Sequence, residues 1–219
     1  MRLLRSFVCF LLFGAAAVVR AADGDRQVWF GGSLEGALAG GVKVKVEEAA
    51  YYGHDEAEVY QHYFQPTLGW SPCSWLQLAA GCRFVFARAS SGWSCEDRIL
   101  ADATLKFAPG DWGFKNRFRI AYRSREGKDD LWRFRNKTNL ALPWRLTSWG
   151  IVPYLAEEVF LEQEREGIYR NRLYVGMTAA EIFALKHLGG ELYLLWQSTD
   201  AEPGSEDIYV LGTMLRLCF

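Results

Sequence analysis

Residues 207–219 alternate between two kinds of side chain, and this alternation constrains the fold more than any other feature of the chain. One face carries Tyr209, Leu211, Thr213, Leu215, Leu217 and Phe219, and the other carries Ile208, Val210, Gly212, Met214, Arg216 and Cys218. A period of two residues indicates a β-strand with two different environments. One face suits lipid, whereas the other ends in smaller residues and an arginine. The segment is typical of the last strand of an outer-membrane β-barrel, with Leu217 and Phe219 as the membrane-insertion signal.

The same period recurs upstream and predicts nine more strands of about ten residues, the length of a tilted strand that crosses a bilayer. Turn signals such as 71–72, 91–92, 109–111 and 202–204 separate these strands. We therefore expect an all-β fold, an antiparallel transmembrane up-and-down β-barrel of about 10–12 strands. The ten expected strands cover about 42–47, 60–70, 76–87, 98–107, 114–123, 132–142, 151–163, 167–178, 188–198 and 207–219.

The strand number stays open at the beginning of the barrel. The segment 26–38, with Val28, Phe30 and Leu34, resembles an eleventh strand. Single-chain bacterial barrels favour even numbers. The total is therefore either ten, with this segment not a full strand, or twelve, with one strand unrecognised.

Tryptophans support one orientation of the predicted hairpins. If Phe219 is periplasmic, the turns near 38–41, 71–75, 108–113, 143–150 and 180–187 lie on the periplasmic side. Five of the nine tryptophans flank these turns, as expected of an interfacial aromatic belt. They are Trp70, Trp75, Trp112, Trp144 and Trp149.

Residues 1–21 have the pattern of a cleaved signal peptide. Arg2 and Arg5 precede the apolar run 7–19, and small or compact residues precede a cleavage site after Ala21. The alternative is an uncleaved anchor, for which the apolar run is short. We expect three parts: a signal peptide at 1–21, an N-terminal segment and candidate first strand at 22–41, and the barrel at 42–219.

Neither composition nor motifs point to catalysis. The net charge of −1 gives no general attraction to nucleic acid. The cysteines form no C-x-x-C pattern, so we expect free thiols at Cys73, Cys82, Cys95 and Cys218 and no metal site. His62 is expected outside near a membrane interface, without a serine two residues away. We therefore expect no enzymatic activity and no cofactor.

Basic residues concentrate on the predicted inner faces of two neighbouring strands. Outward Lys or Arg near the bilayer centre would cost about 2–4 kcal/mol each, so these side chains are expected in the lumen. The predicted lumenal bases are Lys115, Arg117, Arg119, Arg123, Arg133, Arg135, Lys137 and Arg172, and the predicted acidic partners are Glu96, Asp102, Glu158 and Glu191. Either these groups pair and fill a narrow barrel, or they line a cationic path for an anionic solute.

Several landmarks occur in the order found in a known bacterial family. They are Trp29, the run 66–70, Glu96-Asp97-Arg98, the arginine-rich stretches 117–123 and 131–137, the segments 153–160 and 172–176, and Phe219. The chain resembles the outer-membrane family called domain of unknown function 2490 over nearly all of its expected mature length. The resemblance implies an outer-membrane barrel and supplies no activity or catalytic residues.

These patterns lead to one leading hypothesis and two alternatives. We expect a porin-like or structural barrel in a Gram-negative outer membrane. Its expected partners are outer-membrane lipid, the barrel-assembly machinery during insertion and small anionic solutes, and not nucleic acid. The alternatives are an envelope lipid-modifying enzyme and a soluble periplasmic β-barrel.

Overall fold

A computed structural model describes residues 25–53, 58–90, 92–147, 150–182, 185, 187–201 and 204–219. The described chain is almost entirely β-structure, with one short 3-10 turn, η1 (Ala39–Gly41). The strands are β1 (Asp25–Ala37), β2 (Val42–Gly53), β3 (Glu58–Cys73), β4 (Leu76–Ala89), β5 (Gly92–Phe107), β6 (Gly113–Arg125), β7 (Lys128–Ala141), β8 (Val152–Glu162), β9 (Arg170–Ala179), β10 (Leu188–Ala201) and β11 (Gly204–Cys218). The predicted signal peptide at 1–21 lies outside the described residues.

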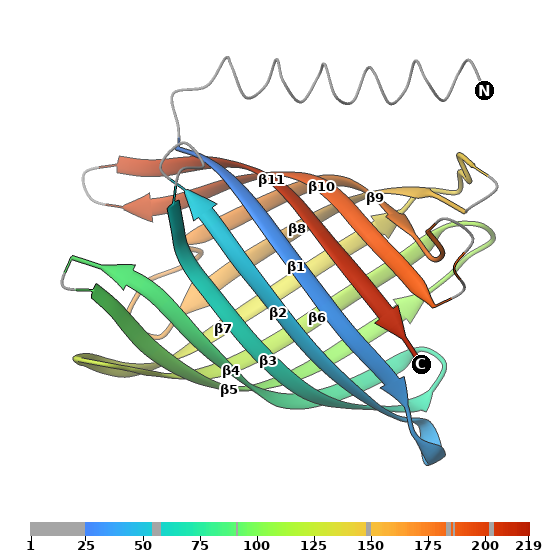
Figure 1. Cartoon of the computed structure of the whole chain (residues 1–219), viewed down its shortest axis with the longest axis horizontal. Helices are drawn as coiled ribbons and strands as arrows, with labels where there is room; N and C mark the ends of the chain where they lie inside the picture. Colours follow the sequence, from blue (N-terminus) through green and yellow to red (C-terminus); the bar gives the residue numbers. More distant parts are fainter. Residues whose placement is uncertain are drawn as a thin grey trace.

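The strands within the described ranges close into a barrel in which each strand pairs with its sequence neighbours. Figure 1 shows the tilted meander, with β1 and β11 side by side. Ten of the eleven pairs are antiparallel, whereas β1 pairs with β11 in parallel, Asp25 opposite Ile208 and Glu35 opposite Cys218. In an up-and-down barrel an odd strand number makes the first and last strands parallel. The expected total of ten or twelve is therefore wrong, because the segment 26–38 contributes a complete eleventh strand.

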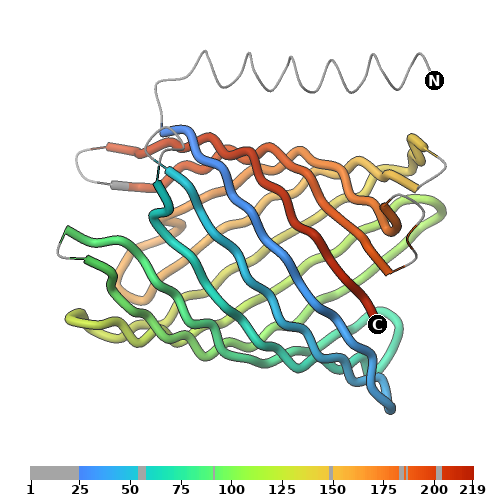
Figure 2. The backbone as a smooth tube through the Cα atoms, viewed as in Figure 1, coloured from blue at the N-terminus to red at the C-terminus, as the bar shows by residue number. Residues whose placement is uncertain are grey.

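The connections fall at two ends, as the hairpin order predicts (Figure 2). We call the end where β2, β4, β6, β8 and β10 finish the loop rim. The opposite end, which carries Phe219, is the C-terminal rim. The β6–β7 hairpin at the loop rim is tight because Gly127 adopts a positive φ of 69°.

The outside of the barrel is largely apolar. Large hydrophobic side chains are exposed on every strand except β2, among them Leu68 at 59%, Ile99 at 66% and Phe118 at 62%. Trp70, Trp75, Trp112 and Trp144 are also exposed and lie toward the C-terminal rim, whereas Trp149 is outside the described residues. A surface of this kind is unusual for a soluble protein and typical of one that faces lipid or a partner.

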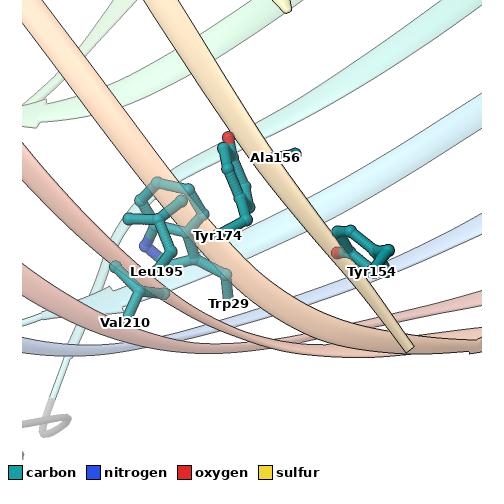
Figure 3. Packing of buried hydrophobic residues seen from close by; sticks show 6 residues of the cluster. All are labelled: Trp29, Tyr154, Ala156, Tyr174, Leu195 and Val210. Atoms are coloured by element: carbon teal, nitrogen blue, oxygen red, sulfur yellow. The ribbon is translucent and has the colours of Figure 1, made fainter. Parts of the chain in front are cut away.

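A small cluster of buried hydrophobic residues, Ala49, Tyr63 and Val85, lies on β2 to β4. The residues of the larger cluster lie inside the barrel on another wall. They come from β1 and from the strands of the second half of the chain: Trp29, Tyr154, Ala156, Tyr174, Leu195 and Val210 (Figure 3). Glycines on neighbouring strands make room for two rings of this wall. A Cβ on Gly212 would lie 2.1 Å from the ring of Tyr193, and one on Gly176 would lie 2.7 Å from Tyr154. This wall fills part of the lumen.

No helix in the described ranges is long and apolar enough to span a membrane.

Candidate functional site

A cavity of about 1530 Å³ occupies the lumen and is lined by side chains from all eleven strands. Typical ligand pockets measure about 300–1,000 Å³, so the paired charges do not fill this barrel. The lining extends from Asp207 and Lys128 near the loop rim to Lys43 and Gln77 near the C-terminal rim.

Strand alternation brings the basic residues of β6 and β7 together on the inside. Arg117 lies opposite Lys137, and Arg119 lies opposite Arg135. All four line the cavity, as do Arg123, Arg133 and Arg172. Lys115 occupies the same face of β6, but it is exposed near the C-terminal rim and lies outside the lining.

Toward the loop rim three arginines contact two carboxylates. Arg123 donates hydrogen bonds to Glu96 and Glu162, and its Nη2 lies 2.8 Å from Glu96 Oε2. Arg133 donates to Glu162 through Nη2 at 2.6 Å, and Arg98 donates to Glu96 through Nε at 2.6 Å. These groups form a lattice of ion pairs, as expected if charged side chains pair with one another inside the barrel.

A second paired set lies on β5 and β6. The buried Arg119 makes a bidentate contact with Asp102, at 2.6 Å from Nε and 2.7 Å from Nη2. Both oxygens of the carboxylate are used, so this pair holds a fixed geometry and adds no net charge.

The middle of the lumen differs, because one carboxylate serves several cations. Arg117, Lys137, Glu158 and Arg172 pair directly across β6 to β9, and we call them the central row. Glu158 is only 1% exposed. Its Oε1 accepts from Arg135 at 2.6 Å and Arg117 at 3.1 Å. Its Oε2 accepts from Tyr174 at 3.0 Å and lies 3.8 Å from Arg172.

Aromatic rings and an amide hold two cations of the central row. Lys137 Nζ lies 3.7 Å from the centre of the Tyr174 ring and, within the described chain, makes no ion pair. The Arg172 guanidinium lies 4.9 Å from the ring centre of Trp29, and its Nε donates to Gln197 at 2.7 Å. Ring faces attract cations without neutralising them, so the positive charge remains.

The cavity as a whole therefore has a positive surplus with a defined location. Fourteen of its described lining residues are Lys or Arg and ten are Asp or Glu. Around Glu158 one carboxylate faces four cations, the three of the central row and Arg135. Of the predicted acidic partners, Glu191 also lines the cavity, where it accepts a hydrogen bond from Tyr154. It does not form an ion pair with the central row within the described residues.

Two lumenal residues were not identified from the sequence. Strict alternation back from His62 puts Tyr60 on the outer face, but the register shifts opposite Tyr51 and Tyr52, and Tyr60 lines the cavity, where it donates to Gln27 at 2.7 Å. Glu162 lies near the end of the expected strand 151–163; it ends β8 and pairs with Arg123 and Arg133. Continuing the alternation two steps beyond Glu158 identifies Glu162, whereas no sequence signal marks the register shift.

Three of the remaining predicted positions, His62, Leu217 and Phe219, lie outside the cavity lining, whereas Cys95 is part of it. The His62 ring stacks on Phe86 at 4.8 Å and contacts Trp93 at 5.4 Å on the outer face. Leu217 is exposed, and Phe219 donates its N–H to the Glu35 carbonyl at 3.0 Å. Cys73, Cys82, Cys95 and Cys218 are free. In the part of the chain that the structure describes, no group of three or more His, Cys, Asp or Glu residues is placed to hold a metal ion.

The fold and the site together define a class: a closed β-barrel with an apolar outside and a lumen that holds a large, charged cavity. A family model described as Protein of unknown function (DUF2490) matches residues 26–207. The chain belongs to this family, as the sequence landmarks predicted. A search of curated proteins finds no match.

Proposed function

We propose that this protein is an outer-membrane β-barrel whose lumen admits small anionic solutes, and that it does so without catalysis. The apolar outside and the tryptophans near the C-terminal rim support a membrane location. The export signal predicted at 1–21 supports the outer membrane, since strand-crossing barrels reach it from the periplasm.

One observation carries the lumenal role, namely the surplus of positive charge around Glu158. Near the loop rim, Arg98, Arg123 and Arg133 each contact Glu96 or Glu162, so each of these three arginines has a carboxylate partner. The central row is not matched, because Arg117, Arg172 and Arg135 share the carboxylate of Glu158 and Lys137 makes no ion pair within the described residues. Unmatched cations that face a cavity attract anions and repel cations.

Planar-bilayer recording of the purified, refolded chain tests this proposal. We expect discrete currents that favour anions, since an entering anion meets the central row. Density-gradient fractionation of cells that express the full chain should place the protein with the outer membrane. The absence of current at all voltages would refute the passage of solutes, provided that a heat-dependent shift in gel mobility shows that the barrel is folded.

A further inference from the structure

A cluster of polar side chains interrupts the apolar outside of the barrel. Their sequence neighbours Arg117, Lys137, Glu158 and Arg172 line the cavity, so alternation places the cluster on the outer face. The cluster spans β6 to β9 and lies in the two register rows on either side of the central row. We call it the outer polar patch; it consists of Asn116, Asn136, Thr138, Glu157 and Asn171.

The outer polar patch lies well inside the apolar belt. Glu157 is five residues from each end of β8. Asn116 follows Trp112 by four residues, which at a strand tilt of about 40° corresponds to a depth of roughly 10 Å. Apolar side chains surround the patch, with Phe118 62% exposed and Leu155 45% exposed. Polar groups at such a depth need protein partners, because acyl chains offer no hydrogen bonds.

The patch satisfies only part of its own hydrogen-bonding capacity. Asn116 and Asn136 exchange amide hydrogen bonds at 3.1 and 3.0 Å, and Asn116 also donates to Thr138 at 2.8 Å. Asn171 donates to Glu157 Oε1 at 3.0 Å. The buried Oδ1 of Asn171 accepts no hydrogen bond. Among the described residues, the Thr138 hydroxyl takes part only as the acceptor from Asn116, and Glu157 accepts only through Oε1. Unused donors and unused acceptors therefore stand side by side, with Thr138 directly opposite Glu157.

We infer that the outer polar patch is the interface with a second copy of this chain, which packs its own β6–β9 wall against it. Barrels insert in one direction, so two copies stand parallel and meet at equal depth. A two-fold axis along the membrane normal then sets Thr138 of one copy against Glu157 of the other. The patch is self-complementary in this arrangement, and isologous contact is the commonest form of dimer. The inference rests on the proposed membrane location and is independent of solute passage.

Cross-linking of the full chain in its native membrane tests the interface. In a chain with the four described cysteines changed to Ser, Thr138→Cys should form dimers with a lipid-soluble oxidant. Glu48→Cys is the matched control, because Glu48 is an exposed carboxylate at mid-strand on β2, across the barrel. Adding Asn136→Leu and Glu157→Leu to the Thr138→Cys chain should lower the dimer fraction about tenfold, since about 1–2 kcal/mol of polar contacts is lost.

Three outcomes would overturn the inference: no cross-link at Thr138→Cys, equal cross-linking at Glu48→Cys, or a cross-linked product whose mass fits a different protein. The heat-dependent gel shift confirms that each variant is folded. Planar-bilayer currents recorded from the same preparations are scored separately. Absence of the Thr138→Cys dimer together with normal anion currents would contradict this inference alone, whereas a Thr138→Cys dimer without currents would contradict only the proposed solute passage.

Discussion

Glu158 determines how the central charges are arranged. Its carboxylate is almost fully buried and accepts hydrogen bonds from Arg135, Arg117 and Tyr174. Three of its contacts come from residues on β6, β7 and β9, so one side chain on β8 ties four strands together. Removing a buried partner leaves uncompensated charge, which costs more than the pair itself contributes.

Glu158→Gln is predicted to lower the free energy of unfolding by about 3–5 kcal/mol, because several cations then face one another without a counter-charge. Urea titration of the barrel in lipid vesicles measures the change. The double variant Glu158→Gln with Arg135→Gln should recover part of the loss. Equal stability of wild type and Glu158→Gln would contradict the arrangement around this carboxylate.

For single residues, the sequence predicted in most cases which side chains face the lumen and which face the outside. Alternation placed Arg117, Arg135 and Lys137 inside because uninterrupted strands keep strict period two. Tyr60 was misplaced because a bulge adds one residue and reverses the faces beyond it. The focus of charge on Glu158 was not predicted either, since it depends on the register of three hairpins.

Among the elements, β1 decides how the barrel closes. Its alternation is weak in sequence because Gly31, Gly32 and Ser33 interrupt the apolar positions. In the structure these small residues form part of a full parallel seam with β11, in which Gly31 makes room for the Met214 side chain. Sequence reasoning favoured an even number because antiparallel closure is the common solution, and no local pattern signals a parallel pair.

A cysteine pair across the seam tests the parallel closure. Phe30 and Thr213 are register partners on the outer face, so Phe30→Cys with Thr213→Cys should form a disulfide in the folded barrel. The control pair Phe30→Cys with Leu217→Cys lies four residues further along β11, about 13 Å away, and should stay reduced. Mass analysis of protease digests distinguishes the two. A disulfide in the control pair and none in the test pair would show a different closure.

For the whole molecule, charge is distributed unevenly around and along the lumen. The loop-rim half holds a lattice of ion pairs around Glu96 and Glu162, the wall of β1 and β8 to β11 carries packed rings, and in the central row three cations accompany one carboxylate. The Arg119–Asp102 pair and the ion pairs around Glu96 and Glu162 fit a structural role for the basic residues, and our proposal of an anion path rests on the central row. The stiff lattice supports the barrel, while the central row supplies the selectivity that we propose.

The reversal potential across a salt gradient tests this account most directly. The wild-type protein should give a reversal potential whose sign shows that anions cross more easily than cations. The double variant Arg117→Gln with Lys137→Gln should shift it toward zero, because two unmatched cations are lost. Lys115→Gln is the matched control, a basic residue on the same face of β6 but outside the cavity lining, and should leave the potential unchanged. A reversal potential that shows selectivity for cations would contradict the claim that the central row selects anions. So would a reversal potential that is the same in wild type and in the double variant.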